Sequence, residues 1–169
     1  MVHRYTAAHS DNEYLMNVVR RIETAAVNVR GTVYTFDDPD LVQALIRAKR
    51  RGVDVEICAD NQQFHNPSST RQPSSIVEMI EAEIRARVGR GLRTTHQKTW
   101  LIDETIAFIG SGNATSNSRN NCSEFGVEST EYCVVASLKH KIATLWEEGR
   151  EIDLNAARSI RGRSASSRR

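Results

Sequence analysis

One stretch of the chain, residues 96–113, contains the types of side chain that could cleave a phosphodiester. It follows the pattern His-x-Lys, four residues, Asp, six residues, Gly-Ser-x-Asn, which specifies His96, Lys98, Asp103, Gly110, Ser111 and Asn113. Six specified residues at fixed offsets arise by chance with odds on the order of one in 10⁵. The pattern occurs once in the chain, and it predicts a catalytic site.

His96 is the predicted nucleophile. A neutral imidazole is available near physiological pH and readily forms a phosphoramidate, which divides cleavage into two displacements. Lys98 would project from the same face of a strand, so its ammonium could reach the phosphate that His96 attacks. Asn113 would add an amide donor and Ser111 a hydroxyl donor for the charge on the phosphate oxygens.

Charged residues around these groups complete the predicted site. Glu124 is the candidate acceptor of a hydrogen bond from the far ring nitrogen of His96, which would fix the tautomer of the ring. Asp103 would end a strand, where a role in a turn or an ion pair fits better than one in the chemistry. Arg90 and Arg93 precede the motif and could bind a phosphate backbone, although solvated loop arginines are an equally good interpretation.

Hydrophobic periodicity and turn signals predict alternating helices and strands. The expected elements are a helix opened by a capping box at Ser10 and Glu13, a strand at 27–36, a helix from Asp38 to Gly52, a strand at 53–57, an exposed loop at 61–73, a helix opened by Ser75 and Glu78, strands at 85–88, 98–102, 105–109 and 125–136, and a closing helix at 138–152. The β-α-β order implies parallel neighbours. We therefore expect one α/β domain over residues 1–154, with a mixed, mostly parallel sheet flanked by helices on both faces.

Charge and cysteine usage limit the remaining possibilities. The net charge of +2 does not by itself mark a nucleic-acid-binding protein. Residues 155–169 hold five arginines and no acid, which predicts a disordered basic tail. A role of this tail in holding polyanions and a solvated terminus without a role are about equally good interpretations. Cys58, Cys122 and Cys133 form no Cys-x-x-Cys pair, so neither a disulfide framework nor a metal site is expected, and no cofactor is implied.

Two sequence patterns bear on membrane insertion and targeting. The chain has no apolar run of about 18 residues, so no transmembrane span is expected. Its first residues lack the apolar stretch of a signal peptide. This favours the cytoplasm for the chain as given, and the periplasm or export if a signal has been removed.

The motif resembles the signature of the phospholipase D superfamily. Short single-motif bacterial nucleases of that superfamily are similar to this chain over about residues 4–152. The similarity includes Thr35-Phe36 before a capped helix, the sequence Ala-Lys-Arg-Arg-Gly-Val-Asp-Val at 48–55, Leu145-Trp146, and the spacing from Asn113 to Glu124.

This resemblance implies how the site would be assembled. Members of the superfamily build one active site from two motifs, with one histidine attacking and the other acting as general acid. A chain with one motif would therefore form a symmetric homodimer, with the site on its two-fold axis. The His96 side chains of both protomers would face one phosphate, beside two copies of Lys98 and Asn113, and no metal would be required.

Three functions compete. The leading hypothesis is a metal-independent nuclease that cleaves DNA or RNA through a phosphohistidine. The alternative is a phospholipid (cardiolipin-type) phosphodiesterase, which would need an apolar entrance that the polar loops do not suggest. The third is an inactive nucleic-acid-binding module, which would not need a nucleophile. The sequence leaves DNA versus RNA and single versus double strands open.

Overall fold

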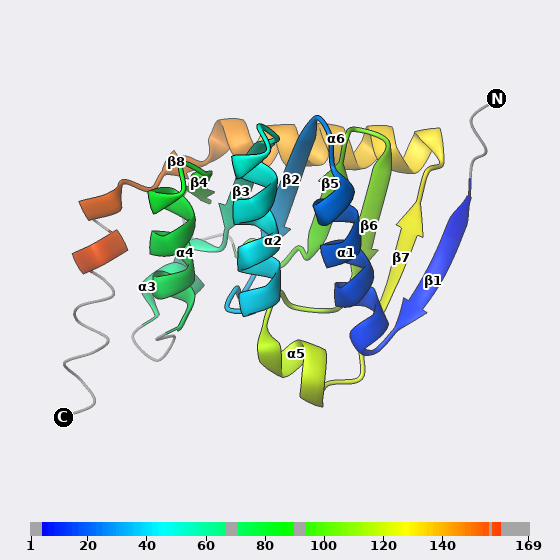
Figure 1. Cartoon of the computed structure of the whole chain (residues 1–169), viewed down its shortest axis with the longest axis horizontal. Coiled ribbons are helices and arrows are strands. Elements are labelled where there is room, and N and C mark those ends of the chain that lie inside the picture. The colour runs from blue at the N-terminus through cyan, green and yellow to red at the C-terminus, as the bar shows by residue number, and fades with distance from the viewer. Residues whose placement is uncertain (1–4, 67–70, 90–93, 156, 160–169) are drawn as a thin grey trace.

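The computed structural model describes residues 5–66, 71–89, 94–155 and 157–159 (Figure 1). The elements of the described residues, in chain order, are β1 (Thr6–Ser10), α1 (Asn12–Thr24), β2 (Asn28–Val33), α2 (Pro39–Arg50), β3 (Asp54–Ala59), α3 (Asn61–His65), α4 (Arg71–Glu81), β4 (Arg85–Val88), β5 (Thr99–Ile102), β6 (Ile106–Gly110), α5 (Ser116–Asn121), β7 (Phe125–Ser129), α6 (Tyr132–Glu148) and β8 (Arg150–Glu151). Together the strands form one sheet in the order β1-β7-β6-β5-β2-β3-β4-β8.

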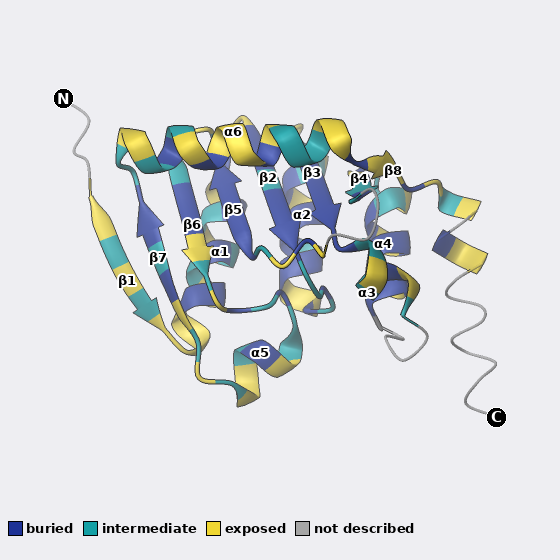
Figure 2. Ribbon diagram, turned by 180° about the vertical axis from the view of Figure 1, so that it is seen from behind, coloured by how far each residue is buried: buried dark blue, intermediate teal, exposed yellow. Residues whose placement is uncertain are grey.

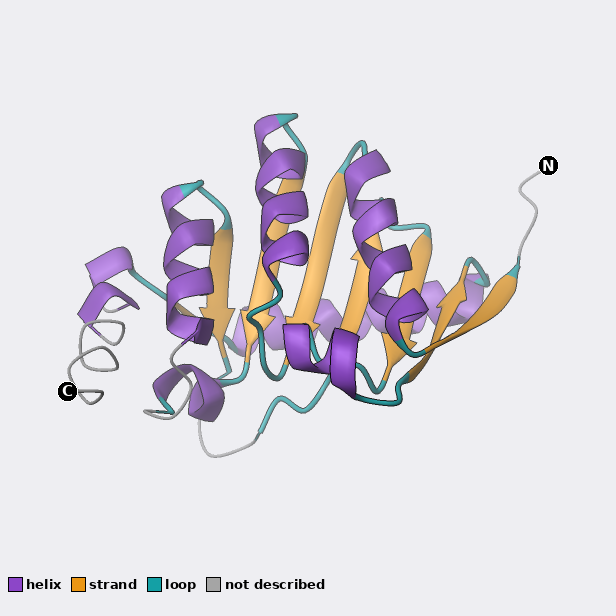
Figure 3. Cartoon of the chain, turned by 60° about the horizontal axis from the view of Figure 1, so that its bottom comes forward, coloured by secondary structure: helices purple, strands orange, loops and turns teal. Residues whose placement is uncertain are grey.

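Helices cover both faces of this sheet, which confirms the expected class. Helices α1, α2 and α4 lie on one face (Figure 1), and α6 crosses the other face near the end of the strands opposite to α5 (Figure 2). Two short helices, α3 and α5, lie beyond the ends of the strands (Figure 3). One edge of the sheet, formed by the ends of the strands rather than by an edge strand, is therefore occupied by α3, α5 and the loops around them.

The expectation that the sheet is mostly parallel is wrong. Among the described strands, only the pairs β2–β3 and β3–β4 are parallel, and the other five pairings are antiparallel. The crossover helices α2 and α4 make the first pairs parallel. A tight turn joins β5 to β6, so these strands run in opposite directions. Helix α5 follows β6 but stays beyond the ends of the strands instead of crossing a face of the sheet, so β7 returns antiparallel to β6 (Figure 3).

The predicted ends of the first two helices are correct in one case and wrong in the other. The predicted helix after Asp38 is confirmed as α2. The Asp38 carboxylate caps it by accepting from the Leu41 backbone N–H at 2.9 Å, and Pro39 lies in the first turn. Gly52 ends the same helix with a φ of 92°, a conformation that L side chains rarely adopt. The capping box at Ser10 is wrong, because Ser10 belongs to β1 and pairs with Phe125.

The expected exposed loop at 61–73 is also wrong in part. It contains α3, whose Phe64 side chain is buried, and α4 begins at Arg71 rather than near Ser75. The predicted strand at 125–136 is too long. Strand β7 ends at Ser129, and helix α6 begins at Tyr132 rather than at residue 138. At the start of the predicted tail, residues 157–159 are helical and Ala157 is buried in the core. Residues 160–169 lie outside the described part of the chain.

Two apolar clusters hold the layers together. The larger one lies between the sheet and α1, α2 and α4, with Tyr14, Trp100 and Phe108 among its fully buried side chains. The smaller one lies under α6 and contains Leu101, Ala107, Val135, Leu138 and Ile142. Among the described residues, α6 is the helix that covers this face, and it crosses the strands near one end only. Their other end, towards α5, has no helix over this face (Figure 2).

Within the described residues, no helix combines the length and the apolar character that a membrane span requires.

Candidate active site

The predicted site residues meet at the sheet edge where α3 and α5 lie. Ser111 directly follows β6, Lys98 directly precedes β5, and Glu124 directly precedes β7. The register explains why they meet: the Gly110 backbone N–H donates to the Lys98 carbonyl at 3.3 Å, and the Ser111 N–H donates to the Phe125 carbonyl at 2.9 Å. Antiparallel pairing of β5, β6 and β7 therefore places the two halves of the motif side by side.

The predicted nucleophile contacts the predicted cation. Lys98 Nζ lies 3.2 Å from both ring nitrogens of His96 and 3.0 Å from the His96 carbonyl oxygen. Only one nitrogen of a neutral imidazole has a free lone pair, so at most one ring contact is a hydrogen bond. The carbonyl oxygen is the better acceptor. It holds the ammonium against the ring, where a bound phosphate would meet both groups.

Tyr34, which sequence analysis did not single out, forms one wall of this pair. Its ring centroid is 4.5 Å from that of His96, and Lys98 Nζ lies 5.0 Å from the Tyr34 centroid. Gln63 Nε2 donates to the Tyr34 hydroxyl at 2.9 Å. Tyr34 follows the buried strand β2 directly, so its position at a strand end was the one signal that could have found it.

Lys98 is 7% exposed. Burial lowers its pKa below the ordinary 10.5, and the negative charge of Glu124 acts in the opposite direction. Glu124 is thus close enough to Lys98 to act on its charge. The site combines a buried cation, a carboxylate and an imidazole.

Glu124 does not make the hydrogen bond that the sequence predicted. Among the hydrogen bonds of the described residues, none joins it to His96. Its carboxylate instead accepts from two serines: Ser111 Oγ donates to Oε2, and Ser118 Oγ donates to Oε1. The motif serine is therefore a partner of Glu124 within this chain. Ser118, on α5, was missed because it lies outside the motif.

Asn113 has unused hydrogen-bonding capacity at this edge. Its backbone carbonyl accepts from the Thr115 N–H at 2.8 Å. Its side-chain oxygen is buried and has no hydrogen-bond partner among the described residues. A buried amide without a partner costs free energy, so such groups mark places where a ligand or water completes the bonding. The unpaired Oδ1 can only accept, from water or from a donor on a ligand, whereas a phosphate oxygen would have to be bound by the N–H groups of the Asn113 Nδ2 atom.

Asp60 fixes the segment that carries the nucleophile. It is fully buried at the start of α3 and accepts from the Gln63 N–H at 2.8 Å and from the Thr95 N–H at 2.7 Å. Because Thr95 precedes His96, this buried carboxylate ties the approach to the motif to the end of β3. A lone aspartate after a strand carries no motif signal, and sequence analysis missed it.

The other two motif residues, Asp103 and Gly110, have structural roles. Asp103 accepts from three successive backbone N–H groups, of residues 26, 27 and 28, at the opposite end of β5. Burial tends to raise its pKa, but these donors outweigh burial and the pKa is lowered. At Gly110, an added Cβ would lie 2.8 Å from Cζ of Tyr14, so the buried tyrosine ring requires glycine there.

Arg90 and Arg93, the predicted substrate-binding residues, lie outside the described part of the chain, so their role stays a prediction. Within the described residues, no group of three or more His, Cys, Asp or Glu side chains is arranged to hold a metal ion.

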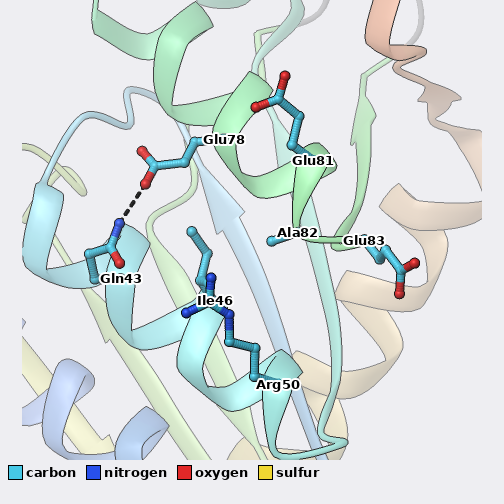
Figure 4. A pocket seen from close by; sticks show the side chains of 7 residues that line it. All are labelled: Gln43, Ile46, Arg50, Glu78, Glu81, Ala82 and Glu83. Atoms are coloured by element: carbon cyan, nitrogen blue, oxygen red, sulfur yellow. Dashed lines mark hydrogen bonds between the residues drawn. The ribbon is translucent and has the colours of Figure 1, made fainter.

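A cavity of about 430 Å³ lies elsewhere, between α2 and α4 (Figure 4). Three glutamates and one arginine are among the residues that line it: Glu78, Glu81, Glu83 and Arg50. Their net negative charge would repel an anionic phosphodiester. None of the predicted site residues lines this cavity, so the edge that holds His96 remains the candidate active site.

Comparison with known proteins identifies the family of the chain. A family model described as "Cardiolipin synthase, PLD-like domain" matches residues 18–146. Mitochondrial cardiolipin hydrolase from Xenopus laevis is 26% identical over 140 residues, which cover 83% of this chain but only 64% of that protein.

Solved structures have the same fold. Nuc, a phospholipase D family member from Salmonella typhimurium, superposes with a TM-score of 0.79 at 23% identity, covering 88% of this chain and 99% of Nuc. NucT from Helicobacter pylori gives 0.80 at 19% identity, covering 89% and 100%. The family model matches well over half of the chain, and the protein therefore belongs to the phospholipase D-like family, within a superfamily of enzymes that act on phosphodiesters.

Proposed function

We propose that the protein is a metal-independent nuclease that cleaves DNA or RNA through a phosphohistidine at His96, in a site shared by two protomers. The observation that carries this proposal is the contact of Lys98 Nζ with the His96 ring at 3.2 Å, at the edge that also holds the Asn113 amide. A nucleophile, a cation and an amide donor together suit a phosphoryl group.

The reaction would proceed in two displacements. A ring nitrogen of one His96 attacks phosphorus, the bond from phosphorus to the leaving oxygen breaks, and the second His96 gives that oxygen a proton. Water then attacks the phosphohistidine, its proton passes to the second His96, and the P–N bond breaks. Lys98 and Asn113 stabilise the charge on the non-bridging oxygens in both steps.

Exposed apolar residues support a second protomer at this edge. Ile109 on β6 is 43% exposed and Phe125 on β7 is 58% exposed. Both side chains lie on the face of the sheet that α6 covers, because alternate residues of a strand share a face. Ile109 is two residues beyond Ala107, which belongs to the cluster under α6. Phe125 is two residues before Val127, and Val127 pairs with Ile109 across the two strands. Phe125 follows Glu124 directly. A partner covering these side chains would bring its own His96 towards the shared phosphate.

The polarity of the neighbouring surface supports a nucleic acid substrate. Helix α5, beside the site, exposes Asn117, Asn120 and Asn121. Amide side chains of this kind bind phosphate and sugar oxygens without reading base sequence. We therefore expect little sequence specificity, and binding that weakens as salt concentration rises.

A lipid phosphodiesterase is the second candidate. The relative from Xenopus laevis is named a cardiolipin hydrolase, and the exposed Phe125 and Ile109 could meet acyl chains instead of a second protomer. The chemistry at His96 would be the same, so only the substrate distinguishes the two proposals.

The test is cleavage of labelled single- and double-stranded DNA and RNA, and of cardiolipin vesicles, in excess EDTA. Wild type should cleave at least one polymer, and His96→Ala should cleave none. Cleavage of cardiolipin alone would replace the nuclease proposal with the lipid one. Absence of any cleavage by the wild-type dimer would contradict both.

A further inference from the structure

Helix α5 reaches Glu124 through one side chain. Ser118 is 2% exposed, and its hydroxyl donates to Glu124 Oε1. A serine hydroxyl has one proton, so this bond uses the whole donor capacity of Ser118. A buried donor committed to a carboxylate forms a charge-assisted hydrogen bond, the stronger kind in proteins.

Ser111 holds the other carboxylate oxygen in the same manner. Its hydroxyl donates to Glu124 Oε2 and accepts from the Phe125 backbone N–H at 3.1 Å. The Ser111 proton is therefore engaged with Glu124 rather than free for a phosphate oxygen. With one serine on each oxygen, the carboxylate cannot rotate without breaking a bond.

The position of α5 is itself fixed from outside the site. Thr115 caps the helix by accepting from the Ser118 backbone N–H at 3.1 Å. Arg119 forms ion pairs with Asp38 at 2.7 Å and with Asp40 at 2.6 Å, and the Asp38 side chain is only 2% exposed. The Ser116 N–H donates to Asp37 Oδ1 at 3.1 Å. The loop between β2 and α2 therefore anchors the helix that carries Ser118.

We propose that Ser118 is a positioning residue that holds Glu124 in its working orientation, with Ser111 as the second half of the same clamp. The effect on turnover rests on the proposed phosphodiesterase function; the clamp itself does not. Without the Ser118 hydroxyl, one oxygen of the carboxylate loses its donor and the group can turn away from the charges that it faces, of which Lys98 is one.

The kinetic test compares Ser118→Ala with Ser123→Ala, a control at an exposed serine beside Glu124. Loss of a hydrogen bond to a charged group should lower kcat about tenfold or more. KM should stay within about twofold, because Ser118 is buried and contacts Glu124 rather than substrate. The control should match wild type. A kcat for folded Ser118→Ala within twofold of wild type would overturn the proposal.

A second measurement tests the clamp without any activity. The Tm values of Ser118→Ala, Glu124→Gln and the double variant form a double-mutant cycle. If the two side chains interact as observed, their Tm changes should fail to add by about 2 °C or more. Additive changes would overturn the clamp. Wild type that cleaves no phosphodiester, with a non-additive cycle, would instead count against the proposed function and leave the clamp standing.

Discussion

Asp103→Ala is the substitution whose effect on stability can be worked out most fully. In the structure, Asp103 Oδ1 accepts from the backbone N–H groups of Val27 at 2.7 Å and Asn28 at 3.0 Å, and Oδ2 accepts from that of Ala26 at 3.0 Å. These bonds tie the β5–β6 turn to the beginning of β2. Asn28 is buried, whereas residues 26 and 27 are exposed.

The magnitude follows from which donors water can satisfy after the substitution. The buried Asn28 N–H would be left without a partner, at a cost of about 2 kcal/mol, and the two exposed N–H groups would rebind water, at about 0.5 kcal/mol each. The sum is about 3 kcal/mol, which for a chain of this size lowers Tm by about 6–12 °C.

Glu104→Ala is the matched control. Both Asp103 and Glu104 have a positive φ, of 49° and 56°, so alanine meets the same backbone penalty at either position. Glu104 forms one exposed ion pair, with Lys139, which contributes about 1 kcal/mol at most. Thermal unfolding of the two variants should therefore differ clearly, while kcat per folded molecule stays at the wild-type value for both.

Two results would refute this reasoning. Equal Tm losses for Asp103→Ala and Glu104→Ala would show that the three hydrogen bonds contribute nothing measurable. A fall in kcat of fully folded Asp103→Ala would show that the motif aspartate takes part in the chemistry.

The pH dependence of the same variant gives a further check. The folded-state pKa of Asp103 is lowered from 3.8, so its contribution is present above that pH and is lost as pH falls through the folded-state pKa. The Tm difference between wild type and Asp103→Ala should stay constant between about pH 5 and 8 and shrink below about pH 4. A difference that grows in acid would contradict the sign.

Two other substitutions test the dimer and the buried cation. Phe125→Ser removes a side chain that is 58% exposed, so the protomer should stay folded. The Kd of the dimer, measured by sedimentation, should rise about 30-fold. The control is Val27→Ser, at an exposed position at the far end of the sheet, which should leave Kd unchanged. An unaltered Kd for Phe125→Ser would place the interface elsewhere. Lys98→Met should lower kcat by about 10²–10³-fold yet raise Tm by about 2–4 °C, because burial disfavours the ammonium and methionine keeps the apolar stem. A lower Tm for Lys98→Met would mean that contacts with His96 outweigh the burial of the charge.

The sequence predicted which residues form the candidate site but not all of the contacts that they make. The motif places His96 two residues before Lys98, and local geometry was enough to predict that they meet. The contact of Ser111 with Glu124 depends on the register of β6 and β7, which a single sequence does not specify. Tyr34 and Ser118 come from other elements, and neither stands in a pattern that identifies a site.

The errors in the fold have a common physical origin. A β-α-β order correctly predicts the parallel pairs of β2, β3 and β4, because a crossover helix leaves little choice. Extending that inference to the rest of the sheet failed, since the turn at Asp103-Glu104 had already made β5 and β6 a hairpin. The polar residues at 61–73 predict a loop because Phe64 alone forms the buried face of α3, which leaves no helical periodicity in the sequence.

The central claim is that His96 is the nucleophile, and trapping the intermediate tests it most directly. Protein incubated with a phosphate-labelled diester substrate in excess EDTA should be quenched within one turnover and its label located by peptide mapping. We predict acid-labile, base-stable label on His96 in wild type and none in His96→Ala. Turnover without a phosphorylated histidine, or label on another residue, would contradict the account.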